Sequence, residues 1–112
     1  RRSCLGYVLD AVEAWNRIAK TASVVGEILN IGNDQEITIA ELANVVRTRL
    51  HSQSEIVLVP YEEVYGPGFE DMFRRVPSLT KLERFIGYRP TTPLADGLPR
   101  FIEWFHQNRA RT

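Results

Sequence analysis

The residues best suited to chemistry lie in one stretch, residues 65–77, which has neither helical nor strand periodicity. Gly66-Pro67-Gly68 predicts a turn there, and Arg74 and Arg75 follow it. A planar guanidinium group can bind two phosphate oxygens at once, so adjacent arginines on an irregular loop could converge on one diphosphate. Because neighbours in an extended segment point in opposite directions, we expect only one of the two arginines to face a ligand.

A second interpretation of the same loop needs no ligand. Glu70 and Asp71 stand shortly before Arg74 and Arg75, and the four charges could neutralise one another on a solvated surface. Composition alone favours this solvated loop. Asn33 presents a similar choice: it could contact a ligand at the carboxyl end of a strand, or simply form a turn with the glycine before it. Residue type alone favours the turn.

Groups needed for catalysis or cofactor binding are missing from this sequence. Dinucleotides bind at closely spaced glycines in a strand-to-helix turn, and the seven glycines here include no such trio. No tyrosine is followed four residues later by a lysine, which would lower the phenol pKa for proton transfer. His51, His106 and Cys4 lie too far apart for a zinc site. We therefore expect this chain to bind neither NAD nor a metal by itself.

Size and charge narrow the classes of protein further. The 112 residues suit one domain, and 44% hydrophobic with 25% charged residues is an ordinary globular composition. Lys plus Arg equals Asp plus Glu at 14 each, without the basic excess of nucleic-acid binders. No apolar run is long enough to span a membrane, and the single cysteine excludes an internal disulfide. We expect a cytoplasmic protein with no nucleic-acid or membrane partner.

The elements that must position these residues follow from periodicity and capping. Asp10, an acidic N-cap, predicts the start of the first helix. The capping box Thr38-Ile39-Ala40-Glu41 predicts the start of the second helix. Ser78 and Thr92 are expected to cap the last two helices, and Gly87 to end the first of these two in the left-handed conformation. The expected elements are a helix from residue 10, a strand at 28–31, a helix at 39–51, a strand at 56–59, a loop at 61–77, a helix at 79–86 and a helix from 93.

This order predicts an α/β fold, a small and mostly helical domain with a short two- or three-stranded parallel sheet. Trp15, Phe101, Trp104 and Phe105 fall at helical spacing, which predicts that they pack in the core. The chain begins with Arg1, and its only methionine is Met72. We therefore expect residues 1–112 to be one domain cut from a longer protein.

Several segments, taken in order, resemble the carboxyl-terminal part of the extended short-chain dehydrogenase/reductase family, which includes NAD-dependent nucleotide-sugar epimerases, dehydratases and decarboxylases. Each segment alone is weak, but together they cover nearly the whole chain in the order of the family. The matching segments are YVLDAVEA (7–14), GEILNIGN (26–33), EITIAELA (36–43), RRVPS (74–78), Lys81, IGYRP (86–90) and TPLADGL (92–98).

The resemblance implies a division of labour within a longer enzyme. An amino-terminal Rossmann domain would hold NAD and the catalytic groups, and this chain would bind the nucleotide diphosphate sugar and could form part of a homodimer. Arg75 or Arg74 would contact the diphosphate, which reverses the preference for a solvated loop. The family's other arginine falls at Ser3 here, so Arg2, one residue earlier, is a weaker candidate. The alternative is a free-standing α/β module that binds a nucleotide or a protein partner.

Overall fold

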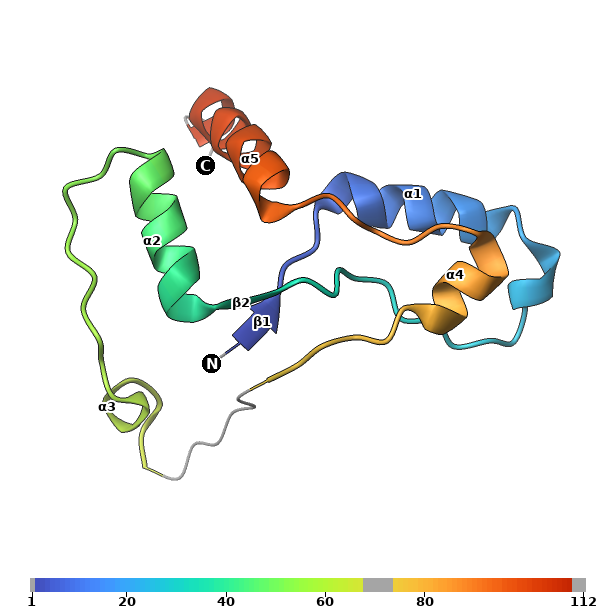
Figure 1. Cartoon of the computed structure of the whole chain (residues 1–112), viewed down its shortest axis with the longest axis horizontal. Helices are drawn as coiled ribbons and strands as arrows, with labels where there is room; N and C mark the ends of the chain where they lie inside the picture. Colours follow the sequence, from blue (N-terminus) through green and yellow to red (C-terminus); the bar gives the residue numbers. More distant parts are fainter. Residues whose placement is uncertain (1, 68–73, 110–112) are drawn as a thin grey trace. The chain divides into compact units, whose positions relative to one another are not determined.

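The computed structural model describes residues 2–67 and 74–109, which fall into two compact units. One unit comprises Arg1–Ser3 with Ile37–Arg75, and the other Cys4–Glu36 with Val76–Thr112. We call them the first and the second unit. The elements, labelled in Figure 1, are β1 (Arg2–Cys4), α1 (Val8–Ala19), a 3-10 turn (Ala22–Val24), β2 (Glu36–Thr38), α2 (Ile39–Arg49), α3 (Tyr61–Tyr65), α4 (Thr80–Ile86) and α5 (Leu94–Asn108).

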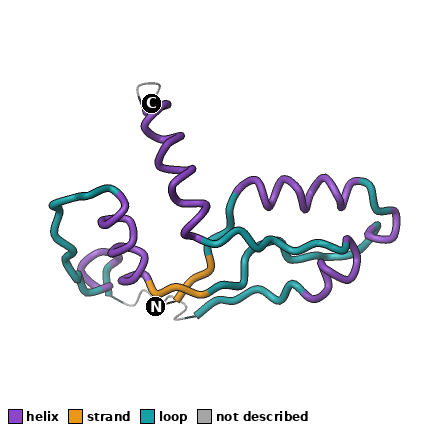
Figure 2. The backbone as a smooth tube through the Cα atoms, turned by 45° about the horizontal axis from the view of Figure 1, so that its top comes forward, coloured by secondary structure: helices purple, strands orange, loops and turns teal. Residues whose placement is uncertain are grey.

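The sheet is as small as expected, but its strands are not those that the sequence predicted. β1 and β2 form a two-stranded sheet in a mostly helical α/β chain. They run in opposite directions, so the expected parallel pairing is not confirmed. Residues 28–31 and 56–59, predicted as strands, form none; they are drawn as loop in Figure 2. β-Branched residues favour an extended backbone, but a strand also needs a partner, and neither segment has one in the described chain.

Helix α2 follows its sequence signal closely. The Thr38 hydroxyl accepts a hydrogen bond from the Glu41 amide at 3.1 Å, and the Glu41 carboxylate accepts one from the Thr38 amide at 3.1 Å. This reciprocal pair is the predicted capping box. α2 ends at Arg49, two residues before the predicted end. Local sequence was sufficient here because both partners lie within one helical turn.

The other predicted helix caps are wrong, and the side chains of Asp10 and Thr92 are used elsewhere. α1 begins at Val8 after Tyr7, and Asp10 lies inside its first turn. α4 follows Leu79 rather than Ser78, although Gly87 ends it in the predicted left-handed conformation at φ 64°. α5 follows Pro93, without a side-chain cap from Thr92. Asp10 and Thr92 instead bond each other across the second unit.

The core of the second unit lies between α1 and α4, which pack side by side (Figure 1). Ala14, Leu79 and Leu82 are buried there, with Leu82 fully inaccessible. The predicted core faces of the long helices are wrong: Trp15 on α1 is 59% exposed and Trp104 on α5 is 56% exposed. α1 instead turns Asp10 and Ala14 inward, so its apolar stripe is left uncovered.

Candidate functional site

The first unit brings two of the predicted site residues together. Arg2, on β1, pairs with Arg74 in an isolated parallel β-bridge, although 71 residues separate them in the chain. Residues directly opposite one another in a β-ladder project from the same face. The bridge therefore places the two exposed arginines side by side, and Arg75, also exposed, follows with the opposite orientation.

Two like charges opposite each other on a ladder are unfavourable, by roughly 0.2–1 kcal/mol. An anion between the guanidinium groups would turn this repulsion into two charge-assisted attractions. Arg74 and Arg75 have further interactions in the structure, so neither is without a partner. The expected pairing with Glu70 and Asp71 falls outside the described residues. The arrangement can bind an anionic group with two adjacent oxygens, such as a diphosphate.

The second unit contains a network of polar side chains that we call the polar clamp, formed by the buried Asp10 and Asn33 and the half-buried Tyr88 and Thr92. The Asp10 carboxylate accepts hydrogen bonds from the Thr92 amide at 2.9 Å and the Thr92 hydroxyl at 2.7 Å. The Tyr88 hydroxyl donates to the same carboxylate at 3.4 Å. Asp10 is only 9% exposed, so these three donors replace the water that its charge would otherwise require.

Asn33 joins the polar clamp to the segment that leads into β2. Its side-chain amide donates to the Thr92 carbonyl at 3.3 Å, and its side-chain carbonyl accepts from the Gln35 amide at 2.8 Å. Asn33 is 3% exposed, and both polar groups of its side chain bond within the second unit. The structure thus uses Asn33 to fix a turn, and its predicted contact with a ligand stays a prediction.

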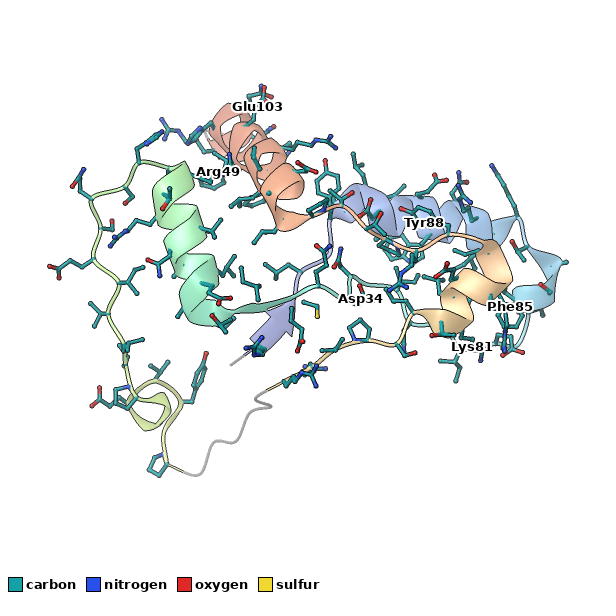
Figure 3. The ribbon with its side chains drawn as sticks, in the orientation of Figure 1. Asp34, Arg49, Lys81, Phe85, Tyr88 and Glu103 are labelled. Carbon is teal, nitrogen blue, oxygen red and sulfur yellow. The ribbon has the colours of Figure 1, made fainter. Side chains whose placement is uncertain are left out.

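Tyr88 contributes both to the clamp and to the surface beside α1 (Figure 3). Burial raises the pKa of its phenol above 10.0, and the nearby Asp10 carboxylate acts in the same direction. The Arg17 guanidinium lies 4.8 Å from the centre of the ring and lowers the pKa by a smaller amount. Tyr88 therefore keeps its proton at neutral pH and remains a hydrogen-bond donor to Asp10.

Sequence reasoning missed the polar clamp because the members that bond one another lie 59 to 82 residues apart. Asp10 and Thr92 had been interpreted as helix caps, a role that local sequence can suggest. No described residues form a cluster that could hold a metal ion. Among the described helices, none has the length and apolar character needed to cross a membrane.

Relatives of the chain carry names that refer to sugars linked to UDP. UDP-N-acetyl-alpha-D-glucosaminuronate decarboxylase of Bacillus cytotoxicus is 42% identical over 104 residues, which cover 93% of this chain and 32% of the relative. UDP-D-apiose/UDP-D-xylose synthase of Oryza sativa is 30% identical over 111 residues, which cover 90% of this chain and 28% of that relative. UDP-glucuronic acid decarboxylase 1 of Danio rerio is 30% identical over 99 residues, which cover 88% of this chain and 22% of that relative. The chain spans less than a third of the length of each relative.

The chain is related to the carboxyl-terminal part of the NAD-dependent nucleotide-sugar epimerase/dehydratase family. The resemblance found in the sequence is thereby confirmed. No family model matches the chain. A solved epimerase structure from Methanothermobacter thermautotrophicus agrees in fold, with a TM-score of 0.84 at 22% identity over 97% of this chain and 31% of that one.

The residues of this epimerase/dehydratase relative do not fit the cofactor of its family. NAD requires a glycine-rich turn between a strand and a helix, so that backbone amides can approach the pyrophosphate. β2 does lead directly into α2, but the junction is Thr38-Ile39 and contains no glycine. The described residues therefore offer no dinucleotide site of this kind.

Proposed function

We propose that this chain is the nucleotide-sugar-binding part of a longer enzyme, and that Arg2 and Arg74 bind the diphosphate of a UDP-linked sugar. The observation that carries the proposal is the bridge that pairs these two arginines on one face. The names of three relatives support UDP as the nucleotide. This match also favours an enzyme part over a free-standing binding module.

The proposed role of the arginines is to bind and orient the substrate. Each guanidinium donates charge-assisted hydrogen bonds to phosphate oxygens, worth about 1.5–3 kcal/mol each. By binding the diphosphate, the arginines fix the position of the sugar without contacting it. The same mode of binding is therefore compatible with several reactions at the sugar. Arg75 projects from the opposite face and is the second candidate if the ligand approaches from that side.

The reaction itself is assigned to the rest of the protein. Two relatives are named decarboxylases of UDP-linked sugar acids, so we propose a UDP-linked uronic acid as the substrate and decarboxylation as the reaction. NAD and the catalytic groups would belong to an amino-terminal Rossmann domain. This chain contributes substrate binding alone, and a homodimer and a cytoplasmic location stay predictions.

The exposed side chain of Ile28 supports the proposal that an amino-terminal domain packs against this part of the chain. Ile28 is 86% exposed and belongs to residues 28–31 of the second unit, which form neither helix nor strand in the described chain. A β-branched, apolar segment with unpaired backbone is a ready surface for pairing with another sheet. We propose that the amino-terminal domain supplies that sheet, which would explain why residues 28–31 carry a strand pattern.

The proposal is tested by calorimetric titration of the complete protein with UDP and with uridine. R2A and R74A should each weaken UDP binding by about 1.5–3 kcal/mol, roughly 10- to 150-fold. Uridine has no phosphate, so its dissociation constant should stay unchanged in both variants. The matched control is R47A, which removes an exposed arginine from α2 in the same unit.

The outcomes are readily separated. An effect of R75A that matches or exceeds that of R74A would move the contact to the opposite face while keeping the function. If R2A, R74A and R75A all bind UDP as tightly as the unaltered protein, the arginines belong to a solvated loop and the proposed site is wrong. Loss of uridine binding together with UDP binding would point to misfolding rather than to a lost phosphate contact.

A further inference from the structure

Helix α1 carries an apolar stripe that the rest of its unit leaves open. Val8, Val12 and Trp15 follow one another at intervals of four and three residues, which places them on one face of the helix. Their exposed fractions are 66%, 48% and 59%. We call these three residues the open face of α1. A run of large apolar side chains exposed on one face is typical of a surface against which another part of a protein packs.

The open face is not the side by which α1 joins its own unit. Asp10 and Ala14 are the buried residues of α1, and the helix packs against α4. Each of them is two residues from Val12, which at 3.6 residues per turn is roughly 160° around the helix. α1 therefore has one side that its unit fills and an opposite side that stays open, as a helix between two layers has.

Residues 28–31, which carry a strand pattern without forming a strand, are held by the same helix that packs against α1. The Lys81 ammonium group on α4 lies 2.6 Å from the Glu27 carboxylate, just before this segment. The Asn30 side-chain amide donates to the carbonyl of Ser78, just before α4, at 3.4 Å. In α/β folds a helix that leads into a strand packs on the sheet to which that strand belongs.

The length of the relatives indicates what covers the open face. The matches cover 32%, 28% and 22% of the three relatives, so more than two thirds of each relative lies outside the match. Since the chain is related to the carboxyl-terminal part of its family, that remainder precedes the matched part. A segment of this size can form a sheet of several strands. The strands of a parallel sheet are apolar on both faces and need helices as cover.

We propose that the open face of α1 packs against the β-sheet of the amino-terminal part of the complete protein, the same sheet that residues 28–31 join. The inference rests on the proposed function, which assigns that part to the complete protein, and it adds the helix face that covers the sheet. A strand turns every second side chain to one face, so the open face should meet alternating apolar residues. α1 would then lie between this sheet on one side and α4 on the other.

Photo-crosslinking in the complete protein tests this packing. Trp15→p-benzoylphenylalanine places a photoreactive aromatic group on the open face. Irradiation should link it to an apolar strand that precedes residue 1 in the same chain, so the product should keep the mass of one chain, and mass spectrometry of its peptides should locate the strand. Glu13→p-benzoylphenylalanine is the matched control, because the Glu13 side chain lies off the open face and is 44% exposed. The control should form no link to that strand.

A smaller change keeps the test decisive if the photoreactive variant does not fold. V12C leaves a side chain of similar size on the open face. Its thiol should be labelled about 100-fold more slowly, or slower still, in the native complete protein than in the unfolded protein, because labelling requires the packed face to open. E13C should be labelled nearly as fast as in the unfolded protein. Peptide mass spectrometry reads each labelled position separately, so the free Cys4 does not interfere.

The inference fails in either of two cases. A link from position 15 to a second copy, seen as a product of twice the chain mass, would place another molecule on the open face. Rapid labelling of the V12C thiol in the native protein would show that nothing covers this face.

Failure of the packing is distinguishable from failure of the proposed function. If R2A and R74A leave UDP binding unchanged while position 15 links to the amino-terminal part, the diphosphate site is wrong and the packing stands. If both variants weaken UDP binding while V12C is labelled rapidly, the diphosphate site stands and the packing is wrong.

Discussion

The contact between Gly97 and Tyr7 allows a prediction whose sign depends on a second residue. Gly97 is buried in the first turn of α5. A Cβ atom added there would lie 3.1 Å from Cδ1 and 3.5 Å from Cγ of the Tyr7 ring. The first distance is shorter than ordinary van der Waals contact, so the G97A variant must displace the ring or the helix.

Two opposing effects determine how much G97A changes the stability of the start of α5. Alanine favours a helix over glycine by about 1 kcal/mol, whereas overpacking a well-packed site costs about 1–3 kcal/mol. G97A should therefore destabilise the start of α5 by up to about 2 kcal/mol when Tyr7 is present. In a Y7A background the clash disappears, and G97A should instead stabilise the helix by about 0.5–1 kcal/mol.

Native-state hydrogen exchange of the complete protein measures this effect locally. The Gly97 amide bonds to the Pro93 carbonyl at 3.0 Å, so its exchange reports the free energy of opening the first turn of α5. Y7A alone provides the reference for the double variant. Two results would refute the reasoning. One is slower exchange of the residue 97 amide in G97A than in the unaltered protein. The other is an equal effect of G97A with and without the Tyr7 ring.

Two further predictions concern the second unit. L82A should lower the free energy of opening α4 by about 2–5 kcal/mol, because Leu82 is fully buried. The control L50A changes a side chain that is 42% exposed and should leave the opening of α4 unchanged. Hydrogen exchange of the Gly87 amide, which bonds to the Glu83 carbonyl at 2.8 Å, measures both effects. The raised pKa of Tyr88 makes its protonated form contribute stability below pH 10.0, and this contribution is lost as pH rises through the folded-state pKa. Y88F should therefore lose less stability than the unaltered protein as the pH is raised past 10.0, and an identical pH dependence in chemical unfolding would contradict the role of Tyr88.

Local sequence determined the features whose partners lie within a turn or two of one another. The capping box of Thr38 and Glu41 and the left-handed stop at Gly87 depend on nearby backbone alone, and both were predicted correctly. The ordered family segments likewise indicated the relatives. Residue type alone also singled out the two arginines after the turn at Gly66, and their contact with a phosphate stays a prediction.

Tertiary structure decided which of these residues meet. Nothing in the local sequence pairs Arg2 with Arg74, or directs Asp10 to Thr92 instead of to the first amides of its own helix. At Asp10 the choice between a local partner and a distant one is settled by burial, because an enclosed carboxylate bonds the donors that lie beside it. Strand formation failed as a prediction for a similar reason, because the pattern in residues 28–31 records a preference for extended backbone but not whether a neighbouring strand is there to pair with it.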